Sequence, residues 1–424
     1  MLEDHPKGIM VMFTTEMWER FGFYIMMAIL VLYMGSEFGW SDSVKGDHYG
    51  VFLGLVYLIP LLGGYFGDKL FGQINTVIAG ASLMMFGYVA LAISSADQLV
   101  SFYIGLFLVA FGTGIFKVNM AVLIGNLYRD KIHLKDAGFN IFYMGVNVGA
   151  TIAPLAATLL GYFFNDYRMS FWAAAFGMLI CLITFYSGKG KLMTADVKQS
   201  KNSEKEIVFE EMSKKESTSR ILTLGLLFTI VIFFWMAFYQ NGFALTLFAE
   251  RSTKIYDFLR PETYQFFNPF FILVLTPILL TIFSKLNKKG KEPSTPVKIF
   301  IGMIIMSASM LIMVVASLQG GNDDANNMFP GWLISTYLIV TLSEILISPL
   351  GQSYVSKVAP PKIQGLMMGG WFLATSIGAL GSGLIGKFYS DFLHHEYFLI
   401  LTGILLFSVF LAFISMKKLK RFAN

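Results

Sequence analysis

Twelve apolar segments, each long enough to cross a bilayer as a helix, dominate the chain and limit what it can fold into. A membrane-spanning helix needs about 20 consecutive, mostly apolar residues. Only 14% of the 424 residues are charged, whereas soluble domains carry about 25%. The expected spans are 8–34, 48–67, 73–94, 98–120, 138–163, 170–188, 219–247, 263–285, 296–318, 329–350, 362–386 and 393–416. The sequence therefore predicts an all-α membrane protein with twelve transmembrane helices.

A polar stretch rich in Lys, Glu and Ser, residues 190–220, separates the first six spans from the last six. It is too short and too polar to hold two further spans. We expect it to be a cytoplasmic linker between two six-helix bundles, residues 1–189 and 221–424. Two such halves suggest the major facilitator architecture, in which the substrate binds near the membrane midplane.

Basic residues gather in loops on one side of the expected membrane, in 128–137, 284–296 and the tail 417–421. The opposite loops 35–47 and 319–328 are mostly acidic. Because Lys and Arg are enriched in cytoplasmic loops, this asymmetry predicts a multi-pass protein of the cell membrane with both termini in the cytoplasm.

The first span carries three ionisable residues, Glu16, Glu19 and Arg20. Their spacing places all three on one helix face. Charges at a helix end can snorkel to the headgroups, but an apolar stretch follows these three. We therefore expect them to face a water-filled cavity on an ion or proton pathway. Lys117, in the fourth span, either snorkels or pairs with Glu19 or Glu16.

Several classes of site find no support in the sequence. The single cysteine, Cys181, excludes an intramolecular disulfide, and the five histidines lack metal-ligand spacing. No nucleophile–base constellation supports an enzyme, and we expect no cofactor. The net charge of +5 reports membrane topology and gives no indication of nucleic-acid binding.

The pattern Glu16-x-x-Glu19-Arg20-Phe21-x-Phe23-Tyr24 resembles the first-helix signature of the proton-dependent oligopeptide transporter family. Further motifs follow in matching order: Gly112-x-Gly114-x-x-Lys117, Phe142-Tyr143, Asn147-x-Gly149, Gln265…Asn268-Pro269, Glu344…Ser348-Pro349 and Met368-Gly369…Trp371-Phe372. The resemblance covers nearly the whole chain. It implies a major facilitator fold, and proton-driven import of di- and tripeptides by alternating access, in a protein that we expect to be a monomer.

The resemblance also implies residue roles. The proton-coupling network would be Glu16, Glu19, Arg20 and Lys117, with Lys117 also near the peptide carboxylate. Glu344, with Asn147 and Asn268, would hold the peptide amino end and backbone, and the side-chain pockets would be lined by Tyr24, Tyr57, Trp235, Ser348 and Trp371. We expect a competitive cycle, in which the substrate carboxylate binds Lys117 and frees Glu19 to take a proton. Release of both would then restore the Lys117–Glu19 pair.

The chain departs from the family pattern in three ways. Bacterial members usually carry two extra helices between the halves, for which the linker here is too short. Met27 stands where the family often has Arg, and Tyr239 stands where many bacterial members have Glu. These departures leave open a carrier for another small solute, such as nitrate, an amino-acid conjugate or a drug-like molecule. A nutrient receptor or an uncoupled facilitator is a third possibility. We also expect Pro269 to kink the eighth span.

Overall fold

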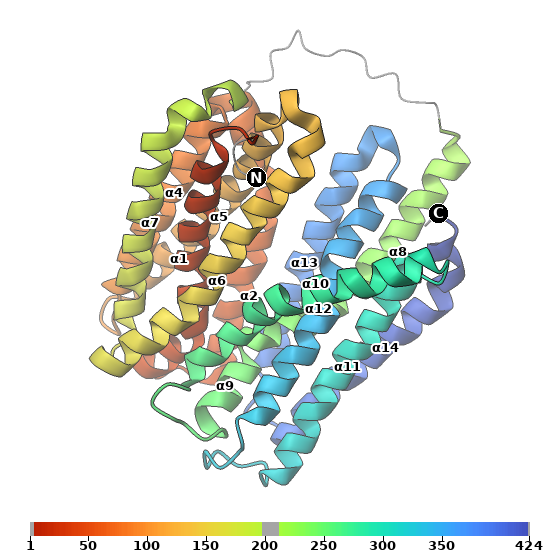
Figure 1. The fold of residues 1–424 in the computed structure, drawn as a ribbon. Helices are drawn as coiled ribbons and strands as arrows, with labels where there is room; N and C mark the ends of the chain where they lie inside the picture. The colour runs from red at the N-terminus through yellow and green to blue at the C-terminus, as the bar shows by residue number, and fades with distance from the viewer. Residues whose placement is uncertain (1–3, 197–211, 423–424) are drawn as a thin grey trace. The chain divides into compact units, whose positions relative to one another are not determined.

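The computed structural model describes residues 4–196 and 212–422, and these residues are almost entirely helical (Figure 1). Among them, twelve helical segments are long and apolar enough to cross a membrane, which confirms the predicted number of spans. The helices up to the expected linker are α1 (Ile9–Phe38), α2 (Asp42–Leu58), α3 (Pro60–Tyr65), α4 (Gln73–Ala92), α5 (Leu99–Leu127), α6 (Lys135–Phe164) and α7 (Arg168–Gly188). After it come α8 (Lys214–Phe238), α9 (Ala244–Arg251), α10 (Phe267–Lys288), α11 (Thr295–Gln319), α12 (Gly331–Val358), α13 (Gln364–Gly386) and α14 (His394–Lys420).

The chain forms two compact units, and each unit is built from three separate stretches of the sequence. The first unit comprises Met1–Trp40, Leu55–Lys205 and Asp257–Phe266. The second comprises Ser41–Gly54, Glu206–Tyr256 and Phe267–Asn424. Residues 197–211, about half of the predicted linker, lie outside the described residues.

In the first unit, α1 packs against α6 and α7, and α4 packs against α5 and α7 (Figure 1). Glycines allow these helices to approach closely. A methyl group on Gly80 would lie 2.8 Å from the carbonyl oxygen of Gly112, and one on Gly149 would lie 3.0 Å from the backbone nitrogen of Phe21. Small residues at helix crossings are the usual means of bringing membrane helices together. The α1–α6 contact matters because α1 carries the three charges.

We expect Gly149→Ala to destabilise the protein and Gly403→Ala, in α14, to be neutral or stabilising. Gly403 has no atom within 4 Å of an added methyl group, and alanine favours a helix over glycine by about 1 kcal/mol. At Gly149 the methyl group meets backbone atoms of α1, and such overpacking costs roughly 1–3 kcal/mol. Thermal unfolding in detergent compares the two variants. Equal melting temperatures would contradict the close α1–α6 contact.

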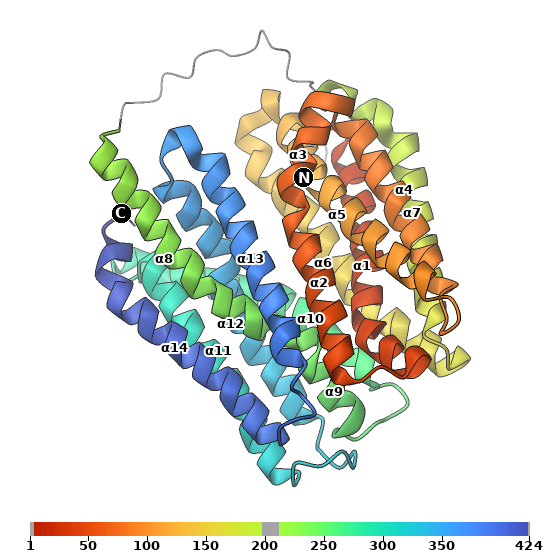
Figure 2. The ribbon, with the colours of Figure 1, turned by 180° about the vertical axis from the view of Figure 1, so that it is seen from behind.

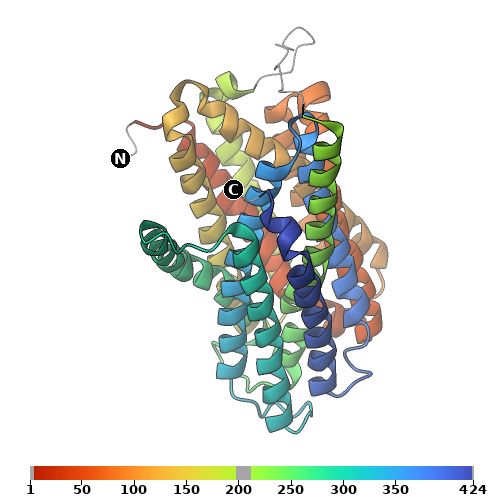
Figure 3. The ribbon, with the colours of Figure 1, turned by 90° about the vertical axis from the view of Figure 1, so that its right-hand side faces the viewer.

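In the second unit, α8 packs against α13 and α14, and α11 packs against α12 and α14 (Figures 2 and 3). α13 carries a run of glycines at positions 378, 381, 383 and 386, and small residues of this kind let membrane helices pack closely. A methyl group on Gly378 would lie 2.8 Å from the carbonyl oxygen of Ile232 in α8, and Gly383 lies directly against the backbone of Gly46 and Gly50.

Each unit has two ends. The end that lies near the N-terminus in the first unit, or near the C-terminus in the second, is called the terminal end, and the opposite one is called the distal end. The terminal end of the first unit contains His5, whose ring hydrogen-bonds the Tyr128 hydroxyl at 2.7 Å. Its distal end contains Tyr33, which donates to the Ser94 carbonyl at 2.8 Å. At the terminal end of the second unit, Arg220 donates to the Val358 carbonyl at 3.2 Å. The distal end of the second unit contains Asp42, Arg251 and Ser390.

Some predicted boundaries are wrong. The fourth span was expected to end at residue 120, but α5 continues to Leu127 because residues 121–127 are apolar apart from Asn126. The second span is broken into α2, α3 and a π-helical stretch, Phe66–Phe71. Pro269, where a kink was expected, lies in the first turn of α10, directly after the 3-10 stretch Pro261–Phe266, and there a helix needs no backbone donor.

Candidate functional site

α1 buries all three of its charged residues. Glu16, Glu19 and Arg20 are 2%, 0% and 5% exposed. Nε and Nη2 of Arg20 donate to the two carboxylate oxygens of Glu19, and Nε also lies 3.7 Å from Oε1 of Glu16. Such two-pronged contacts are the strong form of an arginine–carboxylate pair. Arg20 thus contacts both carboxylates that share its helix face, and Glu19 is its principal partner.

Glu16 is the less well satisfied of the two carboxylates. Its Oε2 is buried and has no hydrogen-bond partner among the described residues. A buried charged oxygen without a partner is costly, and protonation removes that cost. Glu19, whose two oxygens both bind Arg20, would lose charge-assisted bonds on protonation. Of the two carboxylates, Glu16 is therefore the one with fewer contacts from the described residues.

Lys117 lies well inside α5. It is ten residues before Leu127, which is about 15 Å along the helix axis, so its side chain cannot snorkel past that helix end. Its side chain is exposed and forms no ion pair with any described residue. It remains close enough to Glu16, Glu19 and Arg20 to interact with them electrostatically. The ion pair predicted between Lys117 and Glu19 is absent from the structure.

Tyr88 in α4 is a neighbour of this cluster that the sequence did not single out. Its side chain is fully buried, and its hydroxyl has no hydrogen-bond partner in the part of the chain described. It interacts electrostatically with Glu19 and Arg20. In the sequence, Tyr88 looks like any tyrosine that packs in an apolar span. Its position beside the charges became clear only from the structure.

The other candidates of the first unit lie on three helices. Tyr24 in α1 and Tyr57 in α2 are half-buried. Asn147 in α6 is half-buried as well, and its Nδ2 donates to the Tyr143 carbonyl of the same helix at 2.9 Å. That intrahelical bond leaves the amide oxygen of Asn147 available to a ligand.

In the second unit, Glu344 lies near the middle of α12. Its Oε2 accepts a hydrogen bond of 2.8 Å from Nδ2 of Asn268, which also donates to Oγ1 of Thr341 at 3.1 Å. Glu344 forms no ion pair with any described residue, and its Oε1 accepts no hydrogen bond from one. The structure thus brings the two predicted residues Glu344 and Asn268 together, and leaves one carboxylate oxygen available.

The aromatic candidates of the second unit pack against one another. The Trp235 ring stacks on Tyr239 at 5.5 Å and meets Trp371 edge-on at 6.5 Å. Trp235 and Trp371 are 6% and 1% exposed. Ser348, one turn from Glu344 on α12, is half-buried. The direct contact of Trp235, Ser348 and Trp371 with a ligand stays a prediction.

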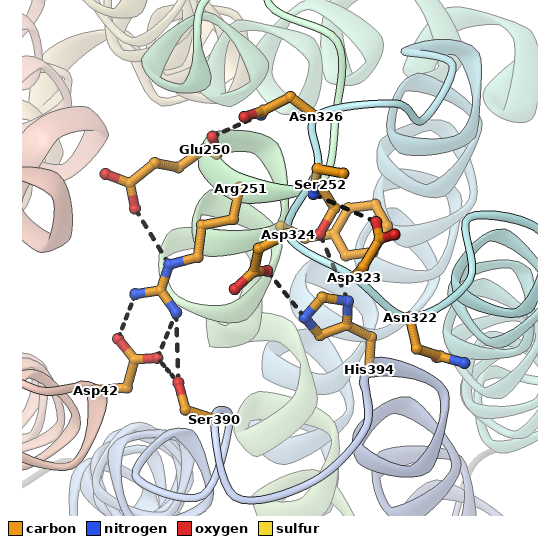
Figure 4. Close-up of polar contacts among 12 residues, drawn as sticks. Asp42, Glu250, Arg251, Ser252, Asn322, Asp323, Asp324, Asn326, Ser390 and His394 are labelled. Atoms are coloured by element: carbon orange, nitrogen blue, oxygen red, sulfur yellow. Dashed lines mark hydrogen bonds and ion pairs between the residues drawn. The ribbon is translucent and has the colours of Figure 1, made fainter.

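Figure 4 presents a further charge cluster, at the distal end of the second unit. The carboxylate of Asp42 accepts two hydrogen bonds of 2.7 Å from Arg251, one from Ser390, and an ion pair of 2.7 Å from Lys45. Nearby, Nε2 of His394 lies 3.3 Å from Asp324. The sequence analysis identified acidic loops but did not predict this cluster, because its residues come from four segments that lie far apart in the chain.

The chain is similar to known transporters over most of its length. A family model described as the POT family matches residues 74–207 and 189–400. An uncharacterized transporter of Bacillus subtilis, YclF, is 31% identical, over 90% of this chain and 89% of its own. A di-/tripeptide transporter of Lactococcus lactis subsp. cremoris is 30% identical, over 94% and 93%. A crystal structure of a peptide transporter in complex with alafosfalin matches with a TM-score of 0.90 and 27% identity, covering 100% of this chain and 97% of that one.

Proposed function

This chain belongs to the POT family, and from that premise we propose that it is a proton-coupled symporter that imports di- and tripeptides by alternating access. Relatives of similar length are named di- and tripeptide transporters, which supports the substrate class. The twelve apolar helices supply the multi-pass scaffold that a carrier needs.

One observation carries the substrate assignment: each unit holds, within a membrane-spanning helix, a charge that forms no ion pair with any described residue. In the first unit it is the ammonium of Lys117, and in the second it is the carboxylate of Glu344. Uncompensated charges inside membrane helices are costly and mark functional sites. A free peptide is a zwitterion, so we propose that Lys117 binds its carboxylate and Glu344 its amine.

Backbone recognition follows from the neighbouring amides. We propose that Asn147 and Asn268 contact the peptide backbone, and that Tyr24, Tyr57, Trp235, Ser348 and Trp371 form the pockets for its side chains. Contacts confined to the termini and backbone leave the identity of the side chains free. Apolar and aromatic pockets then accept varied residues.

We propose that Glu16, Glu19, Arg20 and Lys117 couple this binding to a proton. Arg20 holds Glu19 firmly, whereas Glu16 keeps an open oxygen near Lys117. When a peptide carboxylate occupies Lys117, the electrostatic support that this lysine gives to ionised Glu16 weakens. Glu16 then takes a proton, and once Glu16 is neutral the carrier can change conformation with the peptide bound.

Uptake of labelled di-alanine into liposomes tests the proposal. With an inward proton gradient, the liposomes should concentrate the peptide several-fold above the outside level, and without the gradient they should only equilibrate. No uptake of labelled di-alanine, with or without the gradient, would overturn the peptide assignment, in favour of a carrier for another small solute.

We also propose that both termini and residues 190–220 are cytoplasmic. The terminal ends of both units are rich in Lys and Arg, in the first unit around Arg129 and Lys131 and in the second around Lys417 and Lys418, and such residues favour the cytoplasm. Protease applied outside intact cells should leave residues 190–220 uncut, and cleavage should follow permeabilisation. Cutting in intact cells would contradict this orientation.

A further inference from the structure

The distal end of the first unit contains a cavity of about 400 Å³ whose lining residues all belong to that unit. It is bounded by the last turns of α1 and α6, by the start of α7, and by Arg260. Pockets for small ligands are typically about 300–1,000 Å³ in volume. A dipeptide, roughly 7 Å long when extended, fits such a space. The cavity contains none of the residues assigned above to substrate or proton binding.

Two arginines line this cavity. Among the described residues, the side chain of Arg168 donates only to Asp166, through Nε at 3.1 Å. Nε of Arg260 lies 3.2 Å from buried Glu262, and the Arg260 side chain donates no hydrogen bond to a described residue. Both guanidinium groups therefore retain terminal nitrogens that can bind a carboxylate in a two-pronged manner.

The same cavity also offers a carboxylate. Glu37, in the last turn of α1, lines it and forms no ion pair with any residue that the structure describes. It lies near enough to Arg168 to interact with it electrostatically. Two arginines with free donors and one unpaired carboxylate thus face one small space, a distribution of charge that complements a zwitterion.

Gly161 of α6 keeps the cavity in this form. A methyl group there would lie 3.0 Å from Oε1 of Glu262 and 3.8 Å from Nε of Arg260. Because the position is glycine, the Arg260–Glu262 pair can rest directly on the helix. Glu262, 0% exposed, pairs with Arg260, which itself lines the cavity.

We propose that this cavity is a second, weaker binding site for free peptides, in which the arginines Arg168 and Arg260 hold the carboxylate and Glu37 holds the amine. The proposal rests on the proposed function for its substrate class. Its charges are partly exposed, and exposed charges interact weakly in water, so the affinity is in the millimolar range. A peptide captured here lies outside the site of Lys117 and Glu344.

Labelling of Ser36→Cys tests the proposal on the purified full-length chain in detergent. Ser36 lines the cavity, whereas the natural Cys181 is buried and silent toward a polar thiol reagent. The experiment is performed in the Glu344→Gln background, which removes the amine contact of the principal site. Millimolar di-alanine should slow labelling at least threefold, and N-acetyl-di-alanine amide, which lacks both charges, should not. Unchanged labelling with di-alanine, or equal protection by the blocked peptide, would overturn the proposal.

Two further arms separate a direct from an indirect effect. Protection by di-alanine should disappear in Glu37→Gln and in Arg168→Gln, two conservative changes at the rim of the cavity. Protection that survives in both would place the peptide elsewhere and contradict the proposal.

Phosphatidylethanolamine also carries an ammonium and an oxyanion, so labelling is repeated in nanodiscs with and without it. If only this lipid protects, the cavity is a headgroup site and the proposal is wrong. Labelling requires no transport, so its outcome is independent of the uptake experiment.

Discussion

Glu16→Gln is expected to abolish the gradient-driven accumulation of dipeptide while leaving exchange between equal compartments measurable. Glutamine keeps the size of the side chain but cannot exchange a proton, so a carrier that needs Glu16 to be neutral for part of its cycle becomes uncoupled. In the structure, Oε2 of Glu16 is buried without a hydrogen-bond partner among the described residues, and an amide tolerates that position better than a charge does. Uptake and counterflow of labelled di-alanine in liposomes measure the two activities separately.

Glu19→Gln is the matched comparison. Glu19 binds Arg20 through both oxygens, and removing one partner of a buried ion pair typically costs about 3–5 kcal/mol. We therefore expect Glu19→Gln to lower the melting temperature by several degrees as well as to impair transport, and Glu16→Gln to leave the melting temperature nearly unchanged. If Glu16→Gln still concentrates peptide while Glu19→Gln only exchanges it, then Glu19 is the proton carrier, as first expected from the sequence.

Glu344→Gln should weaken dipeptide binding by roughly 10- to 150-fold, the equivalent of a charge-assisted hydrogen bond worth about 1.5–3 kcal/mol. The carboxylate accepts one hydrogen bond, from Asn268, and its second oxygen is open to the substrate amine. Glutamine can keep the bond to Asn268, so the fold should be unaffected. Competition against labelled di-alanine measures the affinity.

N-acetyl-di-alanine, which lacks the charged amine, supplies the diagnostic contrast. On the wild-type protein, it should compete poorly against labelled di-alanine. The Glu344→Gln variant should discriminate much less between the acetylated peptide and di-alanine. Glu216→Gln is the control, since Glu216 pairs with Arg220 at an exposed position of α8, remote in sequence from the proposed contacts. Equal competition by the acetylated and free peptides on the wild type would mean that Glu344 does not bind the amine.

Much of the architecture could be predicted from the sequence, because hydrocarbon thickness fixes the length of a span. The charges of α1 could be identified because burial in lipid makes an ionisable residue conspicuous. Helix ends were harder to place. Residues 121–127 are apolar apart from Asn126, yet the expected fourth span stopped at residue 120. The position of Lys117 became clear only when α5 was found to continue to Leu127.

Contacts between distant segments could not be predicted in the same way. The partner of Glu19 was expected to be Lys117, but Arg20, adjacent in sequence, occupies both of its oxygens. Tyr88 reaches the charge cluster from α4, and Glu37, Arg168 and Arg260 meet in one cavity although they lie far apart in the chain. No local pattern marks such residues, since their roles arise from helix packing.

The central claim, that peptide and proton move together, is tested most directly by driving protons with peptide. Liposomes containing the protein and an internal pH dye are given external di-alanine at equal pH on both sides, with the membrane potential clamped. We predict that peptide entry acidifies the interior, and that Glu16→Gln, in liposomes preloaded with unlabelled di-alanine, exchanges labelled external peptide without any acidification. Entry of di-alanine into wild-type liposomes with no change in internal pH would contradict proton-coupled transport.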